Sequence, residues 1–182
     1  MKQTSLKSGA GFTLIELIVT IFIITLIAGV SVANYRKGER SRQAAIAADG
    51  VIGAFNFTQN LTLSGRQTSN NNASCRTAAY YFLRVDTSTN IYEVKARNIC
   101  AGDDLIETYS LPGNVRFREI TADATSYVWT ETRFALPFGQ ITFDSDLGVI
   151  PGNPTLNIVV ETLDGSVSRT ITVDSVTGRI DQ

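Results

Sequence analysis

A lone carboxylate near the start of a long apolar segment is the feature of this sequence with the clearest chemical consequence. From Phe12 to Val32 the chain has one charged residue, Glu16. At about 1.5 Å rise per residue, a helix over this stretch is roughly 31 Å long, which is enough to cross a bilayer. A carboxylate placed there raises the free energy of insertion unless it finds a cationic partner. We therefore expect Glu16 to have a function that depends on its charge.

The residues before the apolar segment differ from a secretory signal. Residues 1–11 carry Lys2 and Lys7 and end at Gly11. A secretory signal has its apolar region before the cleavage site and loses it, whereas here the apolar region follows Gly11 and would be kept. Glycine has no Cβ atom, so Gly11 suits an extended position in a peptidase cleft, although a flexible joint before a signal anchor is the alternative.

The composition excludes several kinds of catalytic and metal site. The chain has 182 residues, no histidine, two cysteines and a formal net charge of −1. Without histidine there can be no Ser-His-Asp or Cys-His catalysis and no histidine-ligated metal. A net charge close to zero gives no general attraction to nucleic acid. We expect a protein that is not an enzyme and that binds no cofactor or metal ion.

The two cysteines, Cys75 and Cys100, have two interpretations. A disulfide between them would contribute roughly 3–4 kcal/mol in the chain-entropy model. Two separate buried thiols are the alternative. We favour the disulfide because the domain that follows the membrane segment should lie outside the cytoplasm.

The apolar periodicity predicts that the helix continues past the membrane segment. We expect a helix over residues 12–63, with a membrane-spanning part at 12–33 and an amphipathic second half that the following domain covers. The face to be covered has residues at helical spacing, namely Ala44, Ala48, Val51, Ile52 and Phe55.

The rest of the chain has the signals of strands. Runs rich in β-branched and aromatic residues occur at 79–85, 90–96, 115–120, 127–129, 140–143, 156–160 and 167–173. Asp164-Gly165 lies between two of these runs and indicates a tight hairpin. One long helix followed by antiparallel strands predicts an α+β fold, with a globular antiparallel β domain over residues 64–182.

The stretch from Lys7 to Leu17, KSGAGFTLIEL, resembles the class III signal of type IV pilins and type II secretion pseudopilins. Residues 111–117, 141–143, 169–173 and 177–180 show a weaker, scattered resemblance to the GspH/FimT group of minor pilins. The first resemblance covers about the first fifth of the chain.

The resemblance to prepilins implies a specific processing step and a role for Glu16. A prepilin peptidase would cut between Gly11 and Phe12 and then methylate the new amino group of Phe12. During assembly, Glu16 would meet the positively charged amino terminus of a neighbouring subunit, whereas pairing within its own chain is the alternative. Opposite charges attract strongly in a low dielectric and either one alone is costly, so the pair would set the register between subunits.

The resemblance also implies a function, a set of partners and a location. The chain would be a minor pilin or pseudopilin, a structural subunit of a type IV pilus or a type II secretion pseudopilus. Its partners would be the prepilin peptidase, other pilins or pseudopilins of the filament, and the inner-membrane assembly platform. It would cross the inner membrane once, with the amino terminus in the cytoplasm and the globular domain in the periplasm or outside the cell.

The alternative function is that of a FimT-like DNA-binding minor pilin for DNA uptake. Such proteins use arginines at a basic carboxyl-terminal end, and the corresponding residue here is Arg179. Asp181 stands where a second arginine would strengthen the case, so we favour a solvated Arg179 over a nucleic-acid contact.

Two acidic stretches are interpreted as ordinary surface structure. We expect Asp103-Asp104 to be a solvated loop and residues 144–148 to be a plain turn. Leu147 interrupts the ligand pattern that a calcium loop of the EF type would need.

Overall fold

The computed structural model describes residues 12–65, 67, 75–100, 102–135 and 140–182. The chain forms two units, Met1–Glu39 and Arg40–Gln182. One helix, α1 (Leu14–Ser64), contributes its first part to the first unit and its remainder to the second. The membrane-length segment and the sheet-bearing domain are therefore separate parts of the molecule, and each has its own structure.

In the first unit, helix α1 is apolar on all sides from Leu14 to Val32, apart from Glu16. Every residue from Phe12 to Val32 is exposed in the isolated chain. The helix begins two residues later than the predicted start, at Leu14, because Thr13 lies outside it and caps its amino terminus.

In the second unit, one face of α1 is buried. Ala44, Ala48, Val51 and Phe55 are fully buried, as the periodicity predicted, and Ile52 is partly buried. The same face continues with Thr58 and Thr62, whose hydroxyls donate to the carbonyl oxygens of Ala54 and Thr58 at 2.7 and 3.0 Å. These hydrogen bonds let two polar side chains lie in the core without an unsatisfied donor.

Helix α1 ends just before a glycine that has a left-handed backbone conformation. Gly65 has φ +60°, a left-handed conformation that a glycine adopts without the steric cost of a Cβ atom. The end of the helix at Ser64 agrees with the prediction to within one residue.

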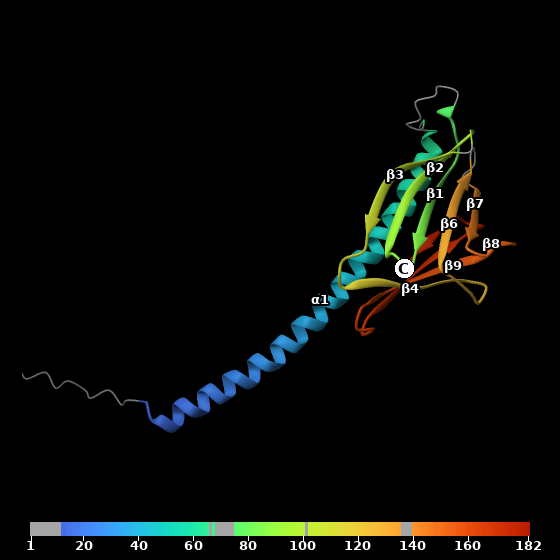
Figure 1. Ribbon diagram of the computed structural model, residues 1–182. Coiled ribbons are helices and arrows are strands. Elements are labelled where there is room, and N and C mark those ends of the chain that lie inside the picture. Colours follow the sequence, from blue (N-terminus) through green and yellow to red (C-terminus); the bar gives the residue numbers. More distant parts are fainter. Residues whose placement is uncertain (1–11, 66, 68–74, 101, 136–139) are drawn as a thin grey trace, which may run out of the picture. The chain divides into compact units, whose positions relative to one another are not determined.

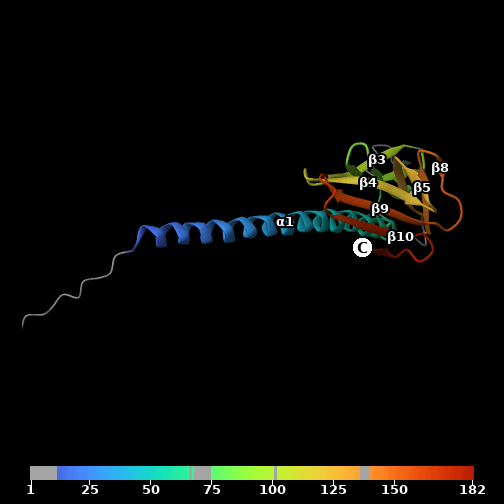
Figure 2. The ribbon, with the colours of Figure 1, turned by 90° about the horizontal axis from the view of Figure 1, so that it is seen from below.

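Eleven strands follow in the described part of the chain and form two antiparallel sheets (Figure 1; Figure 2 shows the same chain from below). The six-stranded sheet has the order β3-β2-β1-β6-β7-β8 and the five-stranded sheet the order β11-β10-β9-β4-β5. The strands are β1 (Ala78–Asp86), β2 (Ile91–Asn98), β3 (Asp103–Ser110), β4 (Val115–Ala122), β5 (Thr125–Tyr127), β6 (Trp129–Ala135), β7 (Gln140–Ser145), β8 (Gly148–Val149), β9 (Thr155–Thr162), β10 (Ser168–Asp174) and β11 (Ile180–Asp181).

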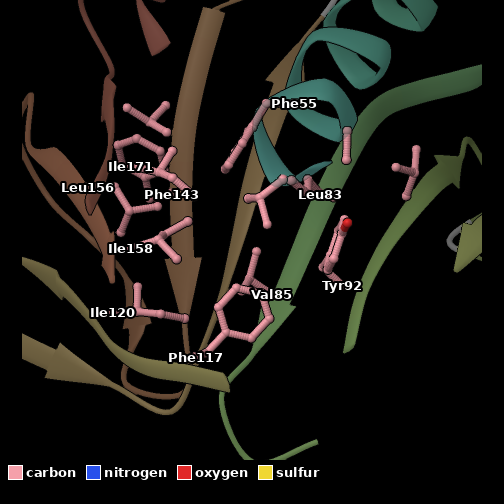
Figure 3. Close-up of a cluster of buried hydrophobic side chains, with 14 of the residues drawn as sticks. Phe55, Leu83, Val85, Tyr92, Phe117, Ile120, Phe143, Leu156, Ile158 and Ile171 are labelled. Carbon is pink, nitrogen blue, oxygen red and sulfur yellow. The ribbon is translucent and has the colours of Figure 1, made fainter. Parts of the chain in front are cut away.

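One hydrophobic core joins α1 and both sheets. Figure 3 shows Phe55 of α1 between Leu83 of the six-stranded sheet and Ile171 of the five-stranded sheet. All three side chains are 0% exposed. Burying apolar surface from three layers in one cluster is what makes the strands and the second part of α1 a single folding unit.

The strand predictions are largely confirmed, and the differences have a physical cause. The run 127–129, expected as one strand, is divided: Tyr127 ends β5 and Trp129 begins β6, and these strands belong to different sheets. Between them, the Val128 carbonyl oxygen accepts hydrogen bonds from the backbone N–H and the hydroxyl of Thr87. A local pattern predicts extended backbone but not which sheet that backbone joins.

The expectation of a loop at Asp103-Asp104 was wrong, because these residues begin β3. Asp103 pairs with Arg97 on β2, and the two residues are also register partners in the sheet. An ion pair across neighbouring strands makes an acidic residue acceptable in an edge strand.

The hairpin prediction at Asp164-Gly165 is confirmed. These residues connect β9 to β10, and Gly165 has φ +68°. The Asp164 carboxylate accepts hydrogen bonds from the hydroxyls of Thr162 and Ser166 at 2.7 and 2.8 Å, which close the turn.

Candidate functional site

The amino-terminal end of α1 is built by a local hydrogen bond that the sequence analysis missed. The backbone N–H of Glu16 donates to the Thr13 hydroxyl at 3.3 Å. Thr13 is the N-cap and Glu16 the third helical residue, which is the spacing of a capping box. The pattern Thr-x-x-Glu before an apolar run was the signal that could have revealed it.

Glu16 lies in the first turn of α1 with its side chain exposed in the chain alone. A carboxylate there interacts favourably with the positive end of the helix dipole. Glu16 therefore has a local role in starting the helix, and its exposed position leaves it accessible to a cation of its own chain or of another.

The structure describes only one of the two residues at the predicted cleavage site. Gly11 lies outside the described residues. Phe12 precedes the helix and is 76% exposed. The structure thus describes the site only from Phe12 onward.

Three hydroxyl side chains of the apolar segment are satisfied within the helix. Thr20, Thr25 and Ser31 donate their hydroxyl hydrogen bonds to carbonyl oxygens one turn earlier, each at 2.8 Å. In a bilayer, where water is not available as a partner, this removes the cost of three hydroxyl groups. Among the described residues, α1 is the one helix that is long and apolar enough to cross a membrane.

Comparison with protein families identifies a known motif in the amino-terminal segment. Residues 6–32 match the family model described as the prokaryotic N-terminal methylation motif. The match covers this amino-terminal segment and not the rest of the 182-residue chain. The motif implies processing by a prepilin peptidase and assembly with other pilins, and together with the apolar helix it indicates a membrane anchor. No curated protein and no solved structure matches the chain.

The disulfide prediction is confirmed in the second unit. Cys75 and Cys100 are bonded, with 5.5 Å between their Cα atoms. The bond ties the residues just before β1 to the connection between β2 and β3. It therefore closes a covalent loop around the β1–β2 hairpin.

Arg179, the residue considered for nucleic-acid binding, has an anionic partner. Its Nε lies 2.5 Å from Oδ2 of Asp181, and its side chain is 74% exposed. This neutral exposed pair supplies little attraction for a phosphate backbone.

Other acidic and aromatic side chains that could have formed a site lie on the surface of the sheets or in the core. Asp144 belongs to β7 rather than to the predicted turn, which begins after Ser145, and it pairs with Arg133. Trp129 lies under the guanidinium of Arg84, 4.3 Å from its carbon to the ring centroid, and Tyr81 is buried in the core. Among the described residues, no group of three or more acidic, cysteine or histidine side chains could hold a metal ion.

Proposed function

We propose that this chain is a minor pilin or pseudopilin, a non-enzymatic structural subunit of a type IV pilus or a type II secretion pseudopilus. The observation that carries the proposal is the methylation motif leading directly into a helix whose apolar side chains are exposed on every side. Such a helix needs a covering environment, and lipid before assembly and the helices of other subunits afterwards both provide one.

The choice of a minor subunit is supported by the scattered resemblance of the second half to the GspH/FimT group. In this role the peptidase would cut between Gly11 and Phe12, and the amino group of Phe12 would be methylated. The globular domain would then lie in the periplasm or outside the cell, where oxidation of Cys75 and Cys100 is favoured.

The decisive experiment is an intact-mass measurement on the protein extracted from membranes of a cell with an active prepilin peptidase. The expected mass is that of a chain that starts at Phe12, carries one extra methyl group and contains one disulfide. Cells without the peptidase serve as the control and should yield the chain starting at Met1. A chain that starts at Met1 in peptidase-competent cells would contradict the proposal.

A further inference from the structure

A groove between the β1–β2 turn and β4 has an unusual excess of hydrogen-bond donors. It has a volume of about 400 Å³ and is lined by Thr87, Asn90, Arg116, Phe117, Arg118 and Glu161. Both arginines are about half exposed, whereas the Glu161 side chain between them is 7% exposed. The groove is therefore a surface site with a buried carboxylate beneath two guanidinium groups.

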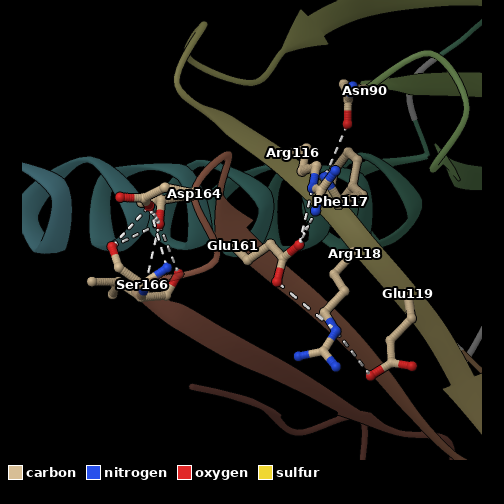
Figure 4. A network of polar contacts seen from close by, with 10 residues as sticks. Asn90, Arg116, Phe117, Arg118, Glu119, Glu161, Asp164 and Ser166 are labelled. Atoms are coloured by element: carbon tan, nitrogen blue, oxygen red, sulfur yellow. Dashed lines mark hydrogen bonds and ion pairs between the residues drawn. The ribbon is translucent and has the colours of Figure 1, made fainter.

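The carboxylate of Glu161 lies closer to the guanidinium of Arg116 than to that of Arg118 (Figure 4). Arg116 donates from Nε and Nη2 to the same oxygen of Glu161, at 2.9 and 2.6 Å. Arg118 Nε lies 3.9 Å from the other oxygen of Glu161 and 3.9 Å from Glu119. These distances are too long for hydrogen bonds, so the Arg118 guanidinium makes none within the described residues.

The backbone around Arg118 places it at the groove. The register of β4 against β9 shifts between Phe117 and Glu119, so Arg118 is the extra residue of a β-bulge. On the opposite wall, Asn90 has φ +56°, and its Oδ1 accepts a hydrogen bond from the Phe117 backbone N–H at 2.9 Å. This bond joins the β1–β2 turn to β4, and the Asn90 Nδ2 donates no hydrogen bond within the described residues.

The uncommitted N–H donors and the charges at the groove indicate which chemical group it would bind. An arginine has five N–H donors, and Arg116 commits only its Nε and one Nη nitrogen, so most guanidinium donors at the groove are uncommitted. Two arginines and two glutamates, Glu119 and Glu161, give the cluster a formal charge of zero, so a ligand must be recognised by hydrogen bonds to the guanidinium groups and not by the net charge of the groove. A single planar carboxylate matches the fork of a guanidinium and adds only one negative charge.

We propose that this groove binds a carboxylate side chain from an acidic segment of another protein, with Arg118 as the principal contact. Arg116, held by Glu161, forms the fixed wall, and Arg118 is free to turn from Glu119 to the incoming carboxylate. Glu119 is 43% exposed and competes for the same guanidinium. The competition makes binding sensitive to residue 119 as well as to residue 118.

The test is a titration of the full chain in a neutral detergent with a capped pentaglutamate peptide, followed through the NMR signals of the arginine Nε–Hε groups. Pentaglutamate should shift the signals of Arg116 and Arg118, whereas capped pentaglutamine should not. Arg118→Gln should weaken binding about three- to five-fold, and Glu119→Gln should strengthen it by a similar factor. Arg169→Gln, which changes an exposed arginine on β10 of the same sheet, is the matched control and should leave the affinity unchanged.

Equal affinity of Arg118→Gln and the unchanged chain would overturn the proposal, as would an unchanged affinity of Glu119→Gln. Inorganic phosphate that binds as tightly as pentaglutamate would overturn the assignment of a carboxylate ligand. Because Arg118 makes no hydrogen bond that the fold needs, loss of folding does not complicate its variant. The titration is independent of processing at Gly11, so a negative result does not affect the proposed function.

Discussion

The hydroxyl oxygen of Tyr92 lies 3.0 Å from the point that a Cβ atom on Gly50 would occupy. Tyr92 on β2 is 5% exposed, and its ring stacks on that of Tyr109 with 5.1 Å between centroids. The Tyr92 ring therefore has little room to move away from a side chain at residue 50. The close approach of α1 to β2 depends on the absence of a side chain at Gly50.

This contact predicts different effects for two glycines of the same helix. Gly53→Ala should raise the free energy of unfolding by roughly 0.5–1 kcal/mol, because alanine favours the helix and nothing lies within 4 Å of its Cβ. Gly50→Ala gains the same propensity but crowds Tyr92, so it should be less stable than Gly53→Ala by about 1–2 kcal/mol. Urea unfolding of the full chain in a neutral detergent measures both values, and equal effects would contradict the packing argument.

The disulfide should account for a large part of the stability of the globular unit. The Cys75→Ala/Cys100→Ala double variant should lose roughly 3–4 kcal/mol of unfolding free energy, because the unfolded chain is no longer constrained over a separation of 25 residues. Reductant should lower the unfolding free energy of the unchanged protein by a similar amount. It should have no effect on the unfolding free energy of the double variant. A reductant effect that persists in the double variant would show that another group is responsible.

The β9–β10 hairpin predicts a pH-dependent contribution at acid pH. Hydrogen bonds from Thr162 and Ser166, with a further contribution from Arg40, lower the pKa of Asp164 to about 2 from an ordinary value of 3.8. Because the pKa of the folded state is the lower one, the stabilisation is fully present above about pH 4 and is lost as the pH falls toward about 2. Asp164→Asn should therefore lower the Tm at neutral pH, and this difference should shrink over that interval. A difference in Tm that stays constant down to pH 2 would argue against an ionic contribution.

The role that we propose for Glu16 in assembly can be separated from its position in the helix cap. Glu16→Leu should still insert into the membrane, because it makes the segment more apolar, but it should enter filaments poorly because the amino terminus of the neighbour loses its counter-ion. Recovery of the variant in sheared or overexpressed filaments measures incorporation. Glu107→Gln, at an exposed acid on β3, is the control and should incorporate normally. Normal incorporation of Glu16→Leu would remove the proposed ionic role.

Much of the architecture could be predicted because the deciding signals are local. The buried positions Ala44, Ala48, Val51 and Phe55 follow from the helical period, and the hairpin at Asp164-Gly165 follows from turn chemistry. The predictions failed where the pairing between strands decided the outcome. Asp103 is in a strand because Arg97 lies opposite it on β2.

At the candidate site, too, some residues could be predicted from the local sequence and others could not. Gly11 and Phe12 were predicted as the processing site from the resemblance to prepilins, and Glu16 stood out as the one charge of an apolar segment, so all three predictions use residues that are continuous in the sequence. The capping role of Thr13 was missed although its spacing was visible. By contrast, Glu161 and the arginines of β4 meet only because β4 and β9 pair with a register that includes a bulge.

The amino-acid sequence by itself determined the apolar helix, its capped and acidic start and the α+β class, because helix formation and membrane length depend on residues close together in the chain. Only the tertiary structure decided that the strands divide into two sheets, that Tyr92 reaches Gly50, and that Arg118 faces an open groove. Strand pairing brings together residues far apart in the sequence, and its energy comes from side-chain packing across strands, which local propensity does not contain.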